Sequence, residues 1–518
     1  MNCMKCGREL SDEGVFCIDC LLEMEKYPVD PGTVVLLPRR RESNIPKKQV
    51  KRHTPAPEEQ IAALRRRVVV LTLLLPRLIG QEQYSYWQLY LFYGTYLAYS
   101  SLGWCEGITL KYGGAHYDEL DKPLIMGQIW MLFAYEVLFF SGLWLVLSVV
   151  EIQKIKYVLL LLACASAVFD ILRYMVQSVL HTVNRIQDYV HVVLSERLLF
   201  ATLAGGALLL GFDSAMALIL SEIFARILSM LYSFWIIRDM VRTRPAGRTA
   251  TVREAKSEIS IGCKLLWALL ASQLVIGIIR FAIEQKWGVL QFGQISLTIS
   301  LSSMIVSCVS AIGVVIFPML KRMRKDQMER IYAPTRTLMS VLIWGILLFF
   351  APMKWVLSRW LPQYGGALEY LALLMPLCLY ESRTAMLTTT YLKAYREEQK
   401  ILKTNVASVA LSLLAAVLTV FLAENLTLAV LSISLLCMAK AYMTEFYVCR
   451  HLRFPLGREL LLEAAMTALF MISGWYGSFL TALCLYGAGY VLYLLLERRP
   501  VQEGIQLLKT EMRGNHER

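Results

Sequence analysis

Apolar runs of about 20 residues, separated by short charged loops, recur along this chain and limit its fold more than any other feature. Hydrophobic residues make up 57% of the 518 residues and charged residues 18%, with a mean hydropathy of +0.50. In lipid, only helices and closed barrels satisfy every backbone hydrogen bond. Barrel strands would alternate over about 10 residues, whereas these runs are continuous. The sequence therefore predicts an all-α polytopic membrane protein.

We predict about fourteen transmembrane helices from the apolar runs. The first is short for a hydrocarbon core of ~30 Å, because Pro76 and Arg77 end its apolar stretch. No feature of the sequence fixes the boundary between the first two at residue 84, and the thirteenth is also short. The approximate limits are 68–84, 85–103, 123–150, 156–180, 189–210, 215–237, 262–283, 291–317, 335–353, 367–391, 401–422, 427–449, 458–473 and 477–496.

The distribution of Lys and Arg among the loops predicts the orientation. Loops on one side, such as "KRMRKDQMER" and "CRHLRFPLGR", are rich in both residues, whereas "GFDSA" and "GWYGS" on the other side hold neither. Cytoplasmic loops retain Lys and Arg, so both termini should be cytoplasmic. The same bias accounts for the net charge of +13, and we expect no nucleic-acid partner.

Two CxxC pairs at the N-terminus have the spacing of a zinc ribbon: Cys3 and Cys6, then Cys17 and Cys20. Four thiolates close a structural Zn²⁺ site and leave no open position for catalysis. In the reducing cytosol, metal binding is favoured over disulfides. We predict a ribbon over residues 1–23, acting as a folded cap or docking module. A basic, Pro-rich tether and a helix start follow over 24–67.

Ionisable residues occur inside several spans, where each costs roughly 2.5–3.5 kcal/mol on insertion scales. Three pairs can be neutralised on one helix face: Asp170 with Arg173, Glu222 with Arg226, and Arg280 with Glu284. Glu196 and Arg197 begin the fifth span, and Glu136, Glu381, Arg383 and Lys440 have no obvious local partner. Such groups either hold helices together or line a cationic cavity for an anionic substrate. The four arginines of spans 4 to 7 favour the cavity as a group. Asp170, Glu222 or Glu381 could carry protons if transport is coupled to an ion gradient.

Five stretches of the sequence form distinctive motifs: "YSYWQLYLFYGTY", "GWCEGITLKYGG", "LDKP", "VIGIIRFAIEQKWG" and "VVIFPMLKRM". They resemble the oligosaccharide flippases of polysaccharide biosynthesis, in the multidrug/oligosaccharidyl-lipid/polysaccharide exporter superfamily. The first three are similar to the second helix and the following cytoplasmic loop of that family, the fourth to its seventh helix and the fifth to the end of its eighth. The resemblance extends over residues 74–498. Before Leu74, the ribbon and tether replace the beginning of the family's first helix.

The resemblance implies two six-helix lobes, residues 68–237 and 262–450, joined by a cytoplasmic linker at 238–261. Two additional helices would occupy 451–497 and a cytoplasmic tail 498–518. It also implies alternating-access transport of an undecaprenyl-diphosphate-linked oligosaccharide across the bacterial cytoplasmic membrane. Polysaccharide polymerases and glycosyltransferases would be partners besides membrane lipid. A basic cavity would stabilise the diphosphate, and the residues implied are Arg77, Arg173, Arg197, Arg226 and, most clearly, Arg280.

Three other functions compete with the flippase. A multidrug or small-cation exporter of the same superfamily would be expected to have an acidic cavity. A polytopic enzyme would need a larger outer loop or a catalytic arrangement such as Ser/His/Asp or DxD, and none is visible. A non-transporting zinc-ribbon sensor would not need so many spans. Because no such catalytic arrangement is visible, we do not expect an enzyme. No GxxxxGK[ST] phosphate loop is present, so we expect no direct use of ATP.

Overall fold

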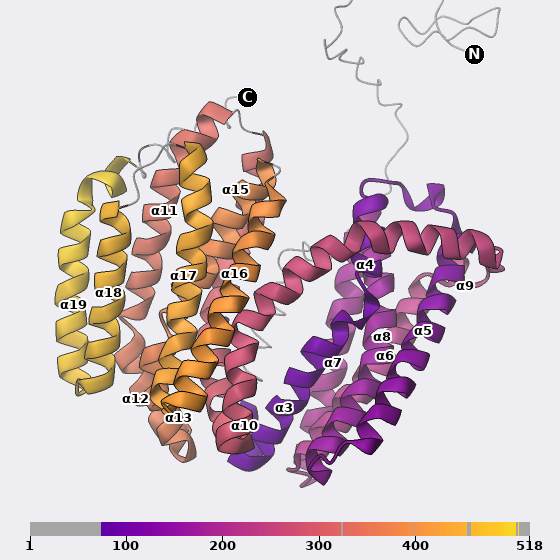
Figure 1. The fold of residues 1–518 in the computed structure, drawn as a ribbon, viewed down its shortest axis with the longest axis horizontal. Helices are drawn as coiled ribbons and strands as arrows, with labels where there is room; N and C mark the ends of the chain where they lie inside the picture. Colours follow the sequence, from indigo (N-terminus) through magenta and orange to yellow (C-terminus); the bar gives the residue numbers. More distant parts are fainter. Residues whose placement is uncertain (1–73, 323–324, 396, 453–456, 504–505, 507–518) are drawn as a thin grey trace, which may run out of the picture. The chain divides into compact units, whose positions relative to one another are not determined.

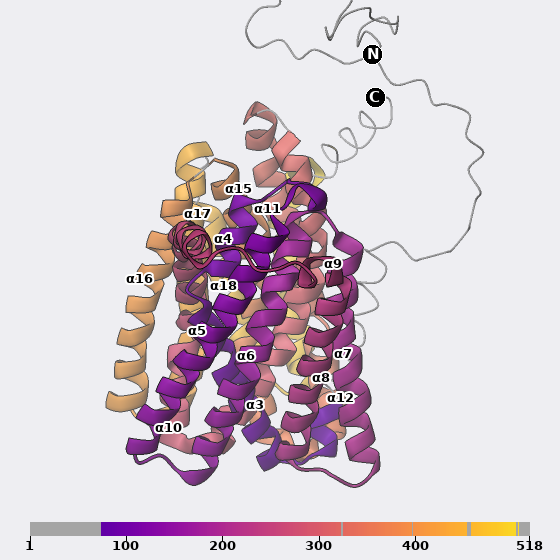
Figure 2. The ribbon, with the colours of Figure 1, turned by 90° about the vertical axis from the view of Figure 1, so that its right-hand side faces the viewer.

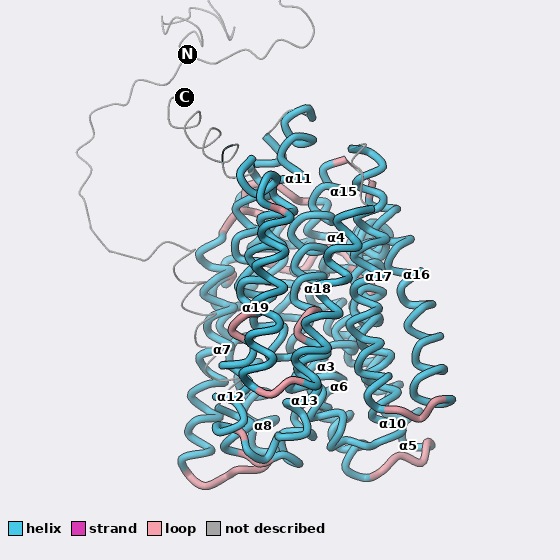
Figure 3. Tube along the Cα trace, turned by 90° about the vertical axis from the view of Figure 1, so that its left-hand side faces the viewer, coloured by secondary structure: helices cyan, strands magenta, loops and turns pink. Residues whose placement is uncertain are grey.

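A computed structural model describes residues 74–322, 325–395, 397–452, 457–503 and 506. The described residues form helices and turns and contain no strand (Figure 3), which confirms the predicted all-α class. The predicted zinc ribbon and tether, and residues 68–73 of the first predicted span, lie outside these residues.

An N-terminal bundle comprises the helices that follow the first predicted span (Figure 1). They are α3 (Gln81–Leu97), α4 (Trp104–Lys111), α5 (Lys122–Val149), α6 (Lys154–Thr182), α7 (Ile186–Leu209) and α8 (Ala215–Ile236). The predicted boundary at residue 84 is wrong, because Gly80 adopts a φ of +71° and α3 begins directly after it. Glycine accepts this left-handed conformation without steric cost.

The linker and the next two predicted spans merge into a single long element. After the short α9 (Arg238–Val241), α10 (Arg248–Arg322) is a 75-residue helix with a break at Gly288, whose φ is +84°. The spans predicted at 262–283 and 291–317 lie on the two sides of this break.

The second part of α10 and the helices after it form a C-terminal bundle (Figure 1). The helices are α11 (Lys325–Leu347), α12 (Phe350–Trp360), α13 (Gly365–Leu374), α14 (Leu377–Arg383), α15 (Thr389–Ala394), α16 (Glu398–Ala416), α17 (Leu426–Leu452), α18 (Gly457–Tyr476) and α19 (Phe479–Leu496). The last two helices, α18 and α19, are the two additional helices. Within the described ranges, eight helices are long and apolar enough to span a membrane, or nine if the bent pair α11–α12 counts as one span.

The long helices expose large apolar side chains on their outer faces. Leu138 on α5 is 73% exposed, and Leu480 on α19 is 66% exposed. Exposure of this kind is unfavourable in water and costs nothing against acyl chains. The helical bundles are therefore built to be covered by lipid.

The first turns of α10 cross beside α4 (Figures 1 and 2) and are fixed to it by close backbone packing. A Cβ atom at Gly107 would lie 2.1 Å from the carbonyl oxygen of Glu258, and one at Gly262 would lie 1.9 Å from that of Gly103. The buried carboxylate of Glu258 accepts a hydrogen bond from Trp104 Nε1 at 3.0 Å. The linker helix therefore belongs structurally to the N-terminal bundle.

Replacing Gly107 with Ala is expected to destabilise the chain by about 1–3 kcal/mol, because the two backbones must separate to admit the methyl group. Thermal unfolding in detergent measures the effect. Gly94→Ala on α3 is the matched control, since nothing lies within 4 Å of its added Cβ, and Ala favours helix over Gly. Equal unfolding temperatures for the two variants would contradict the close packing of α4 on α10.

Candidate functional site

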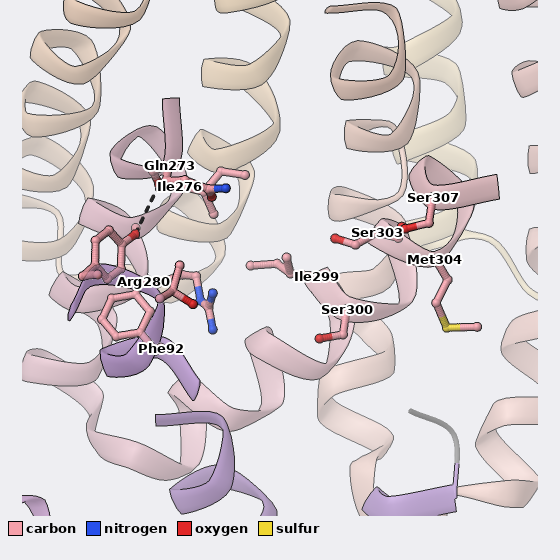
Figure 4. Close-up of a pocket in the computed structure, with 12 residues that line it drawn as sticks. Phe92, Gln273, Ile276, Arg280, Ile299, Ser300, Ser303, Met304 and Ser307 are labelled. Atoms are coloured by element: carbon pink, nitrogen blue, oxygen red, sulfur yellow. Dashed lines mark hydrogen bonds between the residues drawn. The ribbon is translucent and has the colours of Figure 1, made fainter. Parts of the chain in front are cut away.

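A cavity of about 440 Å³ lies between α3 and the two segments of α10 that flank Gly288 (Figure 4). Its volume is in the range of small-ligand sites. Its lining comprises Phe92, Thr95, Tyr96, Gln273, Ile276, Gly277, Arg280, Ile299, Ser300, Ser303, Met304 and Ser307. Each segment contributes residues three or four apart, which helical geometry places on one face. Arg280 is the single charged side chain in this lining, which contains no carboxylate.

α3 and α10 approach each other closely beside the cavity. The Tyr96 hydroxyl donates a hydrogen bond to the carbonyl oxygen of Gln273 at 3.2 Å. A Cβ atom at Gly277 would lie 1.7 Å from the same hydroxyl oxygen. Glycine at position 277 therefore lets the Tyr96 ring lie against α10 and form part of the cavity wall.

The Arg280 guanidinium lies between two aromatic rings at the edge of the cavity. Its Cζ atom is 5.0 Å from the ring centroid of Phe92 and 4.9 Å from that of Phe292. Its Nη2 donates to Ser296 Oγ at 2.8 Å, while Nε is buried and finds no hydrogen-bond partner within the described part of the chain. No carboxylate of the described residues forms an ion pair with it. Arg280 therefore places a positive charge without a carboxylate partner at the cavity.

The predicted pairing of Arg280 with Glu284 is wrong. Glu284 forms an ion pair with Lys156 at the start of α6 instead. The physical reason is that Phe92 and Phe292 hold the guanidinium at the cavity, while Lys156 reaches the buried Glu284 from another helix. A four-residue spacing allows a helical ion pair but does not decide between it and a partner on a neighbouring helix.

Three other predicted arginines form one charge cluster with three carboxylates in the N-terminal bundle, and this cluster is largely buried except for the exposed Arg197. Its members are Asp170 and Arg173 on α6, Glu196 and Arg197 on α7, and Glu222 and Arg226 on α8. The predicted pairs Asp170–Arg173 and Glu222–Arg226 are both present. Glu196 and Arg197 lie near the middle of α7, not at its beginning as predicted. The formal charges of the six residues cancel, so this N-terminal charge cluster differs from the isolated Arg280.

α3 contacts both the N-terminal charge cluster and the cavity. The Tyr90 hydroxyl donates to Ser166 Oγ at 3.0 Å, and Arg226 Nη1 donates to the same oxygen at 2.9 Å. Two residues further along α3, Phe92 lies against Arg280. A movement of α3 would therefore change contacts both in the N-terminal charge cluster and at Arg280.

The two remaining predicted site residues lie apart from the cavity lining. Arg77 stacks on the ring of Trp360, with its Cζ atom 3.8 Å from the ring centroid. Glu381 accepts a hydrogen bond from Lys440 at 3.3 Å, and Lys440 also donates to Ser272 Oγ at 2.9 Å. The structure thus gathers five of the eight predicted binding and coupling residues and separates Arg77, Arg280 and Glu381 from them.

Sequence reasoning missed the hydroxyl groups of the cavity. Ser300, Ser303 and Ser307 line the segment of α10 after Gly288, opposite Arg280 in Figure 4. Their spacing of three and four residues inside an apolar run was the available signal. The four metal-binding cysteines predicted near the N-terminus lie outside the described residues, which contain no other group of His, Cys, Asp or Glu suited to a metal.

Comparison with solved structures identifies the fold. The lipid II flippase MurJ in an inward-closed conformation superimposes with a TM-score of 0.61 at 11% sequence identity, covering 86% of this chain and 99% of MurJ. An inward-facing MATE multidrug transporter of the MOP superfamily gives 0.58 at 11% identity, covering 76% of this chain and 98% of that one. A MATE structure in complex with MaL6 gives 0.52 at 10% identity, covering 77% and 97%.

No protein-family model and no curated protein matches this chain in sequence. Identities near one residue in ten establish a shared fold and nothing finer. The chain therefore has the fold of MOP-superfamily transporters.

Proposed function

We propose that this chain translocates an undecaprenyl-diphosphate-linked oligosaccharide across the bacterial cytoplasmic membrane, with Arg280 binding the diphosphate. The observation that carries the proposal is an arginine without a carboxylate partner among the described residues, at the edge of a cavity between α3 and α10. A lipid II flippase among the structures with this fold agrees with a lipid-linked substrate.

The chemistry of the cavity fits an anionic headgroup that carries hydroxyls. A guanidinium forms charge-assisted hydrogen bonds with phosphate oxygens, and these are about twice as strong as neutral ones. The Arg280 side chain lines the cavity, so the part of its guanidinium that faces the cavity can form such a bond, while its Nε is buried. Serine hydroxyls across the cavity can accept hydrogen bonds from sugar hydroxyls, because Ser300 and Ser307 donate their own protons to backbone carbonyls. The polyprenyl tail would stay in lipid while the headgroup crosses.

The N-terminal charge cluster supports a coupling role beside this binding role. Asp170 and Glu222 neutralise Arg173 and Arg226 in the structure. Protonation of either carboxylate would release positive charge beside α3, and that charge could then favour an anionic substrate. We propose that Arg197, like Arg173 and Arg226, would attract the anionic substrate once a carboxylate of the cluster is protonated. Glu381 would act in the same way on Lys440, and Arg77 would contact substrate only after leaving Trp360.

The remaining parts of the proposal come from the sequence. Both termini would be cytoplasmic, and the four N-terminal cysteines would hold a structural Zn²⁺ ion. Polysaccharide polymerases and glycosyltransferases that make and consume the lipid-linked oligosaccharide would be partners. Multidrug export is the competing function, because MATE transporters share this fold. A cavity lining without a carboxylate argues against cationic drugs.

Rescue of surface polysaccharide in flippase-null bacteria tests the proposal. We expect the intact chain to restore polysaccharide, and Arg280→Ala to reduce it roughly 10- to 100-fold, as expected for one charged hydrogen bond. Arg280→Lys, which keeps the charge, should retain part of the activity. Arg359→Ala is the control, since Arg359 is an exposed cation stacked on Trp355.

Three results would each revise one part of the proposal: the binding residue, the substrate class or the role of the predicted ribbon. Full rescue by Arg280→Ala would remove this residue from the binding site. Failure of the intact chain to rescue any strain, together with lowered accumulation of a cationic dye, would favour the drug exporter. Rescue by a chain lacking residues 1–60 would show that the predicted ribbon is dispensable for transport.

A further inference from the structure

The first turns of α10 carry three exposed cations on one face, Arg248, Arg253 and Lys256, which we term the linker stripe. Together with Thr249 and Val252 they form one open surface on this helix. The opposite face of the same turns is buried through Thr251, Ala255 and Glu258. The packing on α4 therefore fixes which way the linker stripe points.

None of the three cations is neutralised within the described part of the chain. The two carboxylates on neighbouring turns are engaged elsewhere. Glu254 accepts hydrogen bonds from Lys111 and from the Tyr112 hydroxyl, the latter at 2.7 Å. Glu258 is buried and bonded to Trp104 and Gln128. The linker stripe therefore keeps three exposed cations that form no ion pair within the described residues.

Two exposed tryptophans indicate the depth at which the linker stripe lies. Trp235 near the end of α8 is 60% exposed, and Trp267 on α10 is 59% exposed. They flank the linker in sequence, and tryptophan gathers at the level of lipid headgroups. A cationic helix face between two such residues is typical of an element that lies in the interface plane. The richness of this linker in Arg predicts that this interface is cytoplasmic.

We propose that the linker stripe binds the phosphate groups of anionic phospholipids in the cytoplasmic leaflet. Three separated point charges suit several monoanionic headgroups, and each basic residue near an anionic surface strengthens its attraction. The substrate's diphosphate is a poorer occupant, because the linker stripe shares no residue with the cavity at Arg280. The first turns of α10 pack tightly on α4 at Gly107 and Gly262. Headgroups bound to the linker stripe would therefore fix the position of the N-terminal bundle relative to the cytoplasmic leaflet.

Native mass spectrometry of the full-length chain with added lipid tests this proposal without requiring transport, so its outcome is separate from that of the proposed function. The probes are phosphatidylglycerol, phosphatidylcholine and undecaprenyl diphosphate. We expect the triple variant Arg248→Gln/Arg253→Gln/Lys256→Gln to lose tenfold or more in affinity for phosphatidylglycerol. Binding of phosphatidylcholine should not change, and Arg248→Lys/Arg253→Lys should bind as the unmodified chain does.

A matched control variant removes three positive charges from positions outside the linker stripe. Lys403, Arg498 and Arg499 are exposed, lie on the predicted cytoplasmic side and form no ion pair within the described residues. Their triple Gln variant should bind phosphatidylglycerol like the unmodified chain. Equal losses in the two triple variants would overturn the proposal, since general charge would then account for binding. A loss confined to undecaprenyl diphosphate would also overturn it and assign the linker stripe to substrate entry.

Discussion

Replacing Arg383 with Leu is expected to lower the stability of the chain by about 3–5 kcal/mol, the cost of leaving buried charges unpaired. Arg383 is fully buried, and its Nη1 donates to Glu463 Oε1 at 2.6 Å. Its Nη2 lies 3.4 Å from Glu445 Oε2. Without it, Arg336 alone would face three carboxylates, those of Glu445, Glu459 and Glu463. Glu463 belongs to α18, so these ion pairs also fix the first additional helix to the C-terminal bundle.

Thermal unfolding of purified protein measures this effect. Arg359→Leu serves as the control, because Arg359 is exposed and stacks on Trp355. The double variant Arg383→Leu/Glu463→Leu should recover part of the loss, since it removes one of the buried negative charges that Arg336 alone cannot balance. An Arg383→Leu variant that unfolds at the temperature of the control would show that the pairs contribute little.

Replacing Glu196 with Leu should have the second largest effect, also about 3–5 kcal/mol. Its carboxylate lies 3.2 Å from Arg173 Nη1 and 3.9 Å from both Arg197 Nε and Arg226 Nε. Its loss leaves an excess of positive charge among buried helices, where charges are poorly screened. Unfolding temperature and yield of membrane-inserted protein are the readouts.

The control for the Glu196 variant is a substitution at Asp188, which lies on the same helix, α7. Asp188→Leu removes a carboxylate that pairs with Arg185 on the partly exposed surface, where such pairs contribute about 0–1 kcal/mol. The double variant Glu196→Gln/Arg173→Gln restores the charge balance and should be more stable than Glu196→Leu. Equal effects of Glu196→Leu and Asp188→Leu would contradict a buried charge cluster.

The sequence predicted the features that depend on local spacing. Continuous apolar runs indicated the helices, and a three-residue spacing predicted the pair of Asp170 with Arg173. The start of α3 could not be placed, because it depends on the backbone conformation of Gly80. The continuation of the linker into α10 also escaped prediction, since its polar first turns are stabilised by α4 through Gly107 and Gly262.

Ion-pair partners that lie on different helices could be identified only from the structure. Arg383 had no obvious partner in sequence, because Glu445 and Glu463 approach it from α17 and α18. Arg280 had a nearby candidate in Glu284 that proved wrong, since Lys156 from α6 takes that carboxylate. Only the packing of α3 against α10 separates an uncompensated guanidinium from the neutralised arginines of the N-terminal charge cluster.

The most direct test of the account is translocation by the purified chain in vesicles that contain a fluorescent undecaprenyl-diphosphate oligosaccharide. A membrane-impermeant quencher added outside reports how fast labelled headgroups reach the outer leaflet. We expect rapid exchange with the unmodified chain and with Arg359→Ala, and a rate at least tenfold lower with Arg280→Ala. Equal rates for Arg280→Ala and the unmodified chain would contradict it.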